Sequence, residues 1–312
     1  MPRLLTSSAL LAIAVLLSLG PPAWSQKEAP PGGGDLLRIG YSSRLFYDVD
    51  ANDALVATRE WVRNLIRESG GKGESETFIF PDQPAIVKAV NTAKVELVVL
   101  LPEEFVLIRD QAPDLEPMGT CVNRERLGYR YGLLVRKDGG ITRLPQLKRL
   151  KPRRLALDTG DKGSLPRMWM DILLKKEGMP EAGAFFDEIR EFRKTSQAVL
   201  SVFFGQADAC IASLETFETM ADLNPQLGRE IQVLASSREV VRDLICVRKS
   251  FRSDYRKRVE DVIYTFDSRP NGRQFLSMFH VDRIVPYDPA HIQGVLDLFR
   301  DYEALTKRGG RR

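Results

Sequence analysis

Short apolar runs alternate with helical stretches from residue 36 onward, and this alternation limits the fold more than any other feature. Leu36 to Tyr41, Thr77 to Phe80 and Val95 to Leu101 have the length and composition of buried strands. The helical stretches that follow them span 53–68, 84–93 and 104–110. A strand and helix order of βαβαβα predicts a parallel sheet covered by helices.

The same pattern returns after an extended segment at 129–136. The second set of strands is expected at 154–158, 186–192, 209–213 and 231–236, with helices at 165–177, 196–204 and 214–222. A further strand is expected at 244–248, and the remainder is expected to be helical at 254–267, 271–279 and 290–306. Because one core rarely covers so much chain, we expect two α/β lobes.

Two crossover segments, near 130–136 and 236–248, are expected to join the lobes. The first lobe is then discontinuous, with residues 35–134 plus 240–312, and the second lobe spans 135–239. Each lobe is expected to be a mainly parallel sheet flanked by helices. Ligands of open parallel sheets bind beyond the carboxyl ends of the strands, so two facing sheets predict a cleft that closes on a small molecule.

The first 25 residues have the composition of a cleavable secretory signal peptide. One Arg precedes an apolar stretch of 11 residues, Ala9 to Leu19, which is shorter than the roughly 20 residues that span a bilayer. A stably inserted anchor helix is the alternative. No Cys lies near the expected cleavage after Ser25, so no lipid attachment is indicated. Residues 26–34 (QKEAPPGGG) are typical of a flexible linker, and the mature protein is expected in the periplasm.

Charge and reactive residues exclude several functions. The 46 basic and 42 acidic residues nearly balance, and the one short basic run, Lys148 to Arg154, is interpreted as a solvated face, so no nucleic-acid partner is expected. Two His and three Cys offer no credible metal set or cofactor site. Cys121, Cys210 and Cys246 are expected as buried thiols; a bridge between Cys121 and Cys246 is the alternative.

Several segments, taken in order, resemble the type II periplasmic solute-binding proteins of ABC importers, and most closely their phosphonate-binding, PhnD-type branch. These segments are LRIGYSS at 37–43, AIVKAVNTAKVELVVL at 85–100, RYGLLVRKDGGI at 130–141, the run at 153–179, FFGQADACIASLETF at 203–217 and LICVRKSF at 244–251. No single segment is a sharp motif, whereas their order and spacing are fairly specific.

The resemblance implies a site at the strand ends of both lobes. The candidate ligand-binding residues are Ser42, Ser43, Arg44, Tyr47, Glu103, Thr159, Asp161, Lys162, Ser164, Thr195, Ser196 and Glu215. Hydroxyls and free N–H groups at a helix start suit an anion. Asp161 is alternatively a helix cap, Glu215 a charge that complements its own helix, and Tyr47 a packing residue. Where the family offers a histidine this chain has Lys194, and Leu100 to Pro102 replace the usual aromatic.

The resemblance further implies a monomeric protein that captures a small polar solute, such as a phosphonate-like oxyanion, a carboxylate or a zwitterion, and delivers it to an ABC permease. It implies no covalent chemistry. A component that feeds a membrane sensor or another exported partner is the alternative. An exported enzyme on the same fold would need a nucleophile with a base or paired carboxylates, and no motif connects Asp158, Asp161 and Glu215 in that way.

Overall fold

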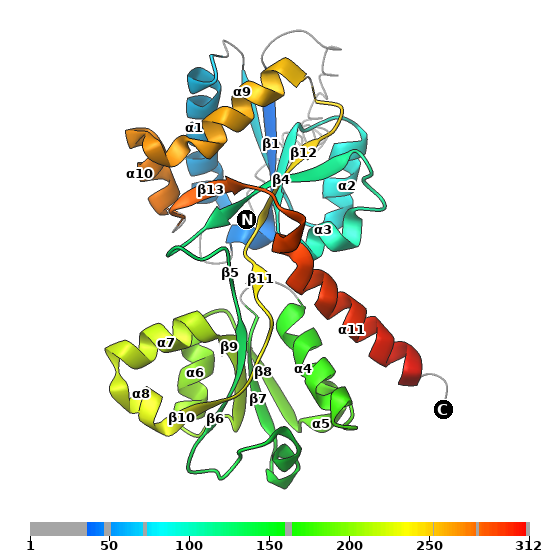
Figure 1. The fold of residues 1–312 in the computed structure, drawn as a ribbon, viewed down its shortest axis with the longest axis vertical. Helices are drawn as coiled ribbons and strands as arrows, with labels where there is room; N and C mark the ends of the chain where they lie inside the picture. The colour runs from blue at the N-terminus through cyan, green and yellow to red at the C-terminus, as the bar shows by residue number, and fades with distance from the viewer. Residues whose placement is uncertain are drawn as a thin grey trace, which may run out of the picture. The chain divides into compact units, whose positions relative to one another are not determined.

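Two mixed β-sheets, each flanked by helices, make up the fold (Figure 1). The computed structural model describes residues 36–46, 51–70, 74–159, 164–251, 253–278 and 281–309. The expected signal peptide (1–25) and linker (26–34) lie outside the described residues, as do Tyr47, Asp161 and Lys162. Within the described ranges no helix is both long and apolar enough to cross a membrane.

The first sheet has six strands in the order β13-β4-β12-β3-β1-β2. They are β1 (Leu37–Ser42), β2 (Ser75–Phe80), β3 (Leu97–Leu100), β4 (Leu115–Val122), β12 (Leu244–Arg248) and β13 (Arg283–Pro286). The predicted parallel pairing holds for β1 with β2 and with β3, whereas β12 and β13 run antiparallel to their neighbours. The short edge strand β13, which ends in proline, lies between the helices expected at 271–279 and 290–306 and was not predicted.

Helices cover both faces of this sheet. On one face lie α1 (Ala51–Glu68), α9 (Ser253–Tyr264) and α10 (Pro270–Met278), and Leu97 of β3 packs in the core beneath them. On the other face, α2 (Gln83–Asn91) and α3 (Pro102–Ile108) share a second core with Val98 of β3. Alternate residues of a strand face opposite sides, so neighbouring Leu97 and Val98 fall in different cores. Trp61 of α1 stacks on Phe275 of α10 at 5.1 Å between ring centroids.

The second sheet has five strands in the order β10-β6-β9-β7-β8. They are β6 (Tyr131–Arg136), β7 (Arg154–Asp158), β8 (Glu188–Phe192), β9 (Ala209–Ser213) and β10 (Ile231–Ser236), and the bounds predicted for β7, β9 and β10 are confirmed. Only β6 runs against the others. The helices are α4 (Leu165–Lys176), α5 (Ala182–Phe185), α6 (Thr195–Phe203), α7 (Leu214–Leu223) and α8 (Pro225–Glu230), of which α5 and α8 were not predicted. The second sheet begins at Tyr131, ahead of the expected lobe boundary at 134.

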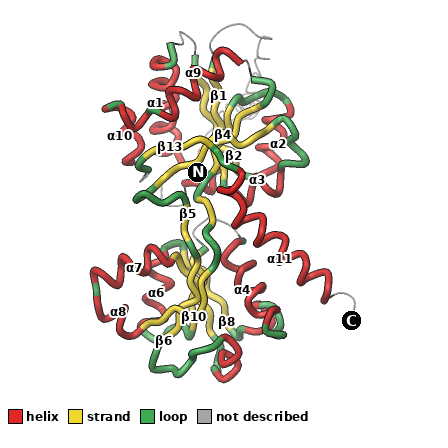
Figure 2. Tube along the Cα trace, viewed as in Figure 1, coloured by secondary structure: helices red, strands yellow, loops and turns green. Residues whose placement is uncertain are grey.

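A short antiparallel pair joins the chain segments that run between the two sheets (Figure 2). Here β5 (Gly128–Tyr129) pairs with β11 (Val240–Val241), and Tyr129 lies opposite Val240. The C-terminal helix α11 (Gln293–Gly309), which follows the turn 289–292, packs on β11 and on α4. Lys176 of α4 and Asp301 of α11 form an ion pair at 3.0 Å. The crossing is therefore held by backbone pairing, by a helix and by an apolar core that includes residues of both sheets.

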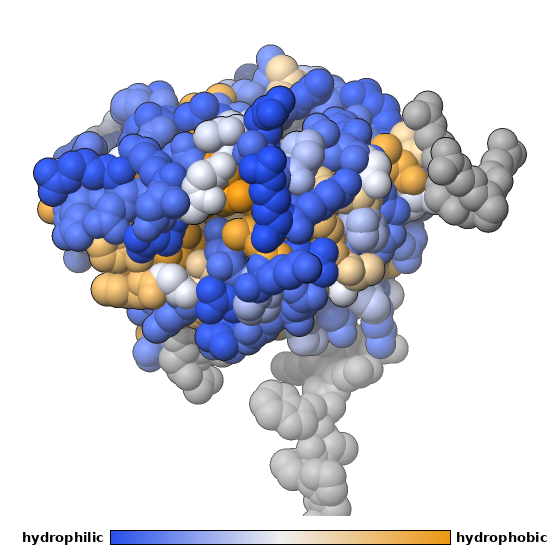
Figure 3. All heavy atoms as spheres, turned by 90° about the horizontal axis from the view of Figure 1, so that it is seen from below, coloured by the Kyte–Doolittle hydropathy of each residue, from blue (hydrophilic) through white to orange (hydrophobic). Residues whose placement is uncertain are grey.

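The sequence also predicted buried cysteine thiols and a solvated basic run at Lys148 to Arg154. All three cysteines are buried free thiols, so the alternative bridge is wrong: β12 places Cys246 opposite Pro117, while Cys121 lies opposite Ile284. In the basic run, Lys148, Arg149 and Lys151 are exposed, as expected of a solvated face, while Arg153 and Arg154 pair with Asp187 and Asp208. The face in Figure 3 is mainly hydrophilic, with separate apolar patches.

Gly128 and Gly294 allow the crossing segments to come into contact. A Cβ on Gly128 would overlap the carbonyl oxygen of Val240, and one on Gly294 would overlap that of Glu239. We predict that Gly128→Ala and Gly294→Ala each lower the free energy of unfolding by about 1 to 3 kcal/mol, because a backbone atom cannot yield as a side chain can. Gly139→Ala is the control, since its nearest neighbour would lie at 3.5 Å. Urea denaturation measures the effect, and equal stability of all three variants would contradict it.

Candidate functional site

Polar side chains gather at the carboxyl ends of β1 and β3. Ser42 ends β1, Arg44 follows in a short 3-10 turn, and Glu103 and Glu104 stand in the first turn of α3. Arg44 lies 3.8 Å from Glu103 and 3.8 Å from Glu104, and the Ser42 hydroxyl donates to Glu104 at 2.9 Å. Three predicted residues, Ser42, Arg44 and Glu103, are thus brought together, and Glu104 joins them.

Glu104 fixes the start of α3 rather than facing solvent. One carboxylate oxygen accepts from Ser42, and the other accepts from the Leu101 backbone N–H at 3.0 Å. A carboxylate in the first helical turn also complements the positive end of the helix. Both Glu103 and Glu104 are buried, at 2% and 0% exposure. Glu104 therefore positions the start of the helix, and its neighbour Glu103 is held beside it.

A smaller group lies at the carboxyl end of β7 in the second sheet. The Thr195 hydroxyl, in the first turn of α6, donates to Asp158 at 2.5 Å. Thr159 continues the sheet through its N–H, which donates to the Phe192 carbonyl at 3.1 Å. Ser164 at the start of α4 is exposed and its side chain makes no capping bond. Thr195 is thus part of a charged group, while Ser164 stands at the surface.

Two tyrosines lie on the crossover between these groups. Tyr129 and Tyr131 are two residues apart on extended backbone and so share a face. Their hydroxyls are hydrogen-bonded at 2.9 Å, and the rings meet edge to face with centroids 5.2 Å apart. Trp169 of α4 stacks on Tyr131 at 6.3 Å. Two buried phenols, hydrogen-bonded to each other, therefore lie on the segment that joins the two sheets.

Charges from both sheets act on the tyrosine pair. Burial is the first cause that raises the pKa of the Tyr129 and Tyr131 phenols. The negative charges of Glu103, from the first sheet, and Asp158, from the second, raise the pKa of both phenols further. Because a raised pKa keeps both phenols protonated at neutral pH, one hydroxyl donates its proton to the other within the pair, and the second hydroxyl keeps a proton to donate to another acceptor. The tyrosine pair therefore lies within electrostatic range of one carboxylate from each sheet.

One cation adjoins the pair from the other crossing segment. Arg242, directly after β11, places its guanidinium carbon 5.4 Å from the centroid of the Tyr129 ring. Its positive charge lowers the pKa of Tyr129, against the larger effect of burial. This residue was missed by the sequence analysis, as were Tyr129, Tyr131 and Glu104. Alternation of Tyr129 and Tyr131 within an expected crossover was a signal that could have found the pair.

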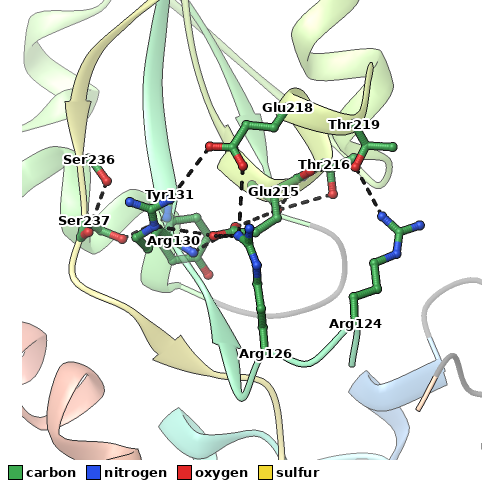
Figure 4. Close-up of polar contacts among 11 residues, drawn as sticks. Arg124, Arg126, Arg130, Tyr131, Glu215, Thr216, Glu218, Thr219, Ser236 and Ser237 are labelled. Carbon is green, nitrogen blue, oxygen red and sulfur yellow. Dashed lines mark hydrogen bonds and ion pairs between the residues drawn. The ribbon is translucent and has the colours of Figure 1, made fainter. Parts of the chain in front are cut away.

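Glu215 occupies a different position from the tyrosine pair (Figure 4). At the start of α7 it accepts from the Arg130 backbone N–H at 3.0 Å and lies 3.4 Å from the side chains of Arg130 and Arg126. Arg130 stands between Tyr129 and Tyr131, so alternation sends it to the opposite face of the strand. Figure 4 shows Arg126 reaching from the turn before β5 toward Glu215 and Glu218. Glu215 thus ties the crossover to α7.

The remaining predicted residues are less engaged. The Ser43 hydroxyl donates to the Pro81 carbonyl at 3.3 Å, and Ser196 stands half-buried in the first turn of α6. No group of three or more metal-ligating side chains is found in the described parts of the chain. His291 is used locally, since its ring nitrogen accepts from the Asp288 N–H at 3.2 Å. The site is therefore one of hydroxyls, carboxylates and arginines.

Comparison with solved structures shows the same fold. A Xanthomonas citri protein described as bound to ATP is 17% identical, with a TM-score of 0.64 over 88% of this chain and 99% of its own. A binding protein component of an ABC phosphonate transporter from Pseudomonas aeruginosa is 15% identical, with a TM-score of 0.59 over 88% of both chains. PhnD1 from Prochlorococcus marinus, in complex with methylphosphonate, is 16% identical, with a TM-score of 0.56 over 87% of this chain and 99% of its own.

These likenesses confirm the predicted type II periplasmic-binding-protein fold, and the sequence itself decides the family. No curated protein is similar enough in sequence to match. The family model described as "ABC transporter, phosphonate, periplasmic substrate-binding protein" matches residues 49–292, which include the second sheet, both crossing segments and every strand of the first sheet except β1. The chain belongs to the periplasmic substrate-binding proteins of phosphonate-type ABC transporters.

Proposed function

We propose that this substrate-binding protein captures a small oxyanion that also carries an ammonium group, and delivers it from the periplasm to an ABC permease. The tyrosine pair is the observation that carries the proposal, because it lies within electrostatic range of Glu103 from one sheet and Asp158 from the other. The phenol proton that the hydrogen bond between Tyr129 and Tyr131 does not use suits an oxyanion, and two carboxylates suit a cation. A solute with both charges uses all four groups.

The ligand-contacting set that we propose is Ser42, Arg44, Glu103, Asp158 and Thr195 with the two tyrosines. Methylphosphonate, the ligand in the Prochlorococcus complex, supplies only the oxyanion part of such a solute. The carboxylates of this chain would repel a bare dianion, so an ammonium group would offset that repulsion. Tyr47, Asp161, Lys162 and Ser164 stay candidates for the rim of the site, with Ser43, Thr159 and Ser196.

Capture is proposed to proceed by closure of the two lobes around the solute. The first lobe would comprise the first sheet with the C-terminal helices, and the second lobe the sheet that starts at Tyr131. Each lobe alone offers only half of the charged groups, so a bound solute favours the closed arrangement. The ion pair between Lys176 and Asp301 and the contacts of Glu215 would then adjust at the edges of the hinge.

Binding without chemistry is proposed for this site. Asp158 is hydrogen-bonded to a threonine and Glu103 lies beside Arg44. Both contacts suit a role in which the acids hold a solute and no covalent bond is made or broken. We further propose that the protein acts as a monomer.

A paired series of ligands tests the charge of the solute. The pairs are methylphosphonate with aminomethylphosphonate, methanesulfonate with aminomethanesulfonate, and acetate with glycine. We predict that the amino member of at least one pair binds about tenfold tighter or more, equivalent to about 1.4 kcal/mol, raises the melting temperature, and reduces the radius of gyration in solution X-ray scattering. Titration calorimetry gives the affinities. Equal or weaker binding by every amino member would contradict the zwitterion.

Glu103→Gln tests which carboxylate receives the ammonium group. The amide keeps the shape but removes the charge, so we predict that the amino member loses most of its advantage while its parent anion binds as well as before or better. Glu60→Gln is the matched control, because Glu60 forms an exposed ion pair with Arg63 on α1. A uniform loss for both members of the pair would point to a structural role for Glu103 instead.

The position of Glu215 leads to a separate prediction. If it holds the crossover, Glu215→Gln and Arg126→Met should disturb binding by similar small factors, with a coupling of about 0.5 kcal/mol in stability, as expected of a partly exposed pair. Hydrogen exchange of the 126–131 amides should increase in both variants. A loss of solute affinity that is large for Glu215→Gln and absent for Arg126→Met would instead make Glu215 a direct ligand contact.

A further inference from the structure

Arg242 stands out among the arginines near the crossover because none of the described carboxylates forms an ion pair with it. Arg44, Arg126 and Arg130 each lie within 4 Å of a carboxylate, at 3.8, 3.4 and 3.4 Å. Within the described ranges no ion pair involves Arg242, and its Nε is buried without a hydrogen-bond partner. We propose that Arg242 is the residue that binds the oxyanion of the solute, with Tyr129 as the platform that holds its guanidinium in place.

Strand register explains how Arg242 reaches the site. Tyr129 of β5 lies directly opposite Val240 of β11. Arg242 is two residues beyond Val240 and so faces the same side, as a diagonal neighbour of Tyr129. Long side chains and aromatic rings meet at such diagonal positions. The 5.4 Å approach of the guanidinium to the ring is the result, and the same ring hydrogen-bonds through its hydroxyl to Tyr131.

The unpartnered Nε indicates a site prepared for an acceptor. A buried donor that lacks an acceptor destabilises the folded protein, and a charged donor does so more strongly. Stacking on the ring of Tyr129 offsets only part of this cost. Arg242 as a whole is half-buried, so its Nε is covered by protein while the residue still reaches the surface. An anion that supplies oxygens at this place would remove the penalty.

The planar guanidinium selects the chemical class of ligand. Its donors match two oxygens of one carboxylate, phosphonate or sulfonate group, whereas an ammonium group would be repelled. The one phenol proton that the hydrogen bond within the tyrosine pair does not use adds a further donor for the same oxygens. Glu103 and Asp158, which act on the tyrosines from the two sheets, are then available for the cationic end. The orientation of the solute is thereby assigned: oxyanion toward Arg242, ammonium toward the carboxylates.

This inference rests on the proposed function, and Arg242→Met and Arg242→Lys separate the two. With aminomethylphosphonate and methylphosphonate as probes, we expect Arg242→Met to weaken both by about 100-fold, as for loss of one partner of a buried charge pair. Arg242→Lys keeps the positive charge but lacks the planar guanidinium, and it should bind both probes about tenfold more tightly than Arg242→Met does. Arg63→Met, which removes an exposed arginine of α1, is the control. Melting of the unliganded variants shows whether each is folded.

The outcomes distinguish the role of Arg242 from the proposed capture of an oxyanionic solute. Wild-type affinity in both Arg242 variants would overturn the role of Arg242 and leave solute capture standing. A loss restricted to aminomethylphosphonate would also overturn it, since that pattern belongs to the carboxylate end. If the unaltered protein binds neither probe and none of the sulfonate and carboxylate pairs, the oxyanion class is wrong and the role of Arg242 falls with it. Weakened binding in Arg242→Met with part of it recovered in Arg242→Lys supports the inference.

Discussion

The pairing of β5 with β11 is the interaction on which the rest of the molecule depends. Only two residues of each strand take part, yet both are parts of the segments that run between the two sheets. Gly128 and Gly294 let these segments and α11 approach to backbone contact. The pair fixes which side chains face one another at the crossing, and places Tyr129 and Arg242 side by side. A change in this register would move both at once, because alternation sends neighbouring residues to opposite faces.

The crossing connects the polar groups of the two sheets, because its tyrosines lie within electrostatic range of both. At the end of β1 and the start of α3, buried Glu104 anchors backbone and leaves Glu103 beside Arg44. At the end of β7, Asp158 and Thr195 form a second, smaller group. Neither group alone resembles a complete binding site. The charges of Glu103 and Asp158, one from each group, both raise the pKa of the tyrosines. A solute bound beside the tyrosines would therefore contact both lobes. Such contacts with both lobes are what closure driven by binding requires.

Much of the fold could be predicted from the sequence because strands β7, β9 and β10 and the longer helices have clear periodicity. The short strand β13 and the helices α5 and α8 have too few residues to show a period, and the pairing of β5 with β11 arises from tertiary contact alone. For the site, the family resemblance pointed to Ser42, Arg44, Glu103 and Thr195 at strand ends, and the structure places them in polar contacts, while their role in binding stays a prediction. Arg242 could not be found in this way, since its neighbour Tyr129 lies more than a hundred residues away along the chain and only register joins them.

A crystal structure of the protein with aminomethylphosphonate tests the central claim most directly. The account predicts that the phosphonate oxygens lie within hydrogen-bond distance of Arg242 and of the Tyr129 or Tyr131 hydroxyl. It also predicts that the ammonium group faces Glu103 or Asp158, with both lobes in contact with the ligand. A solute that touches one lobe alone, or one bound away from the β5 and β11 crossing, would contradict it.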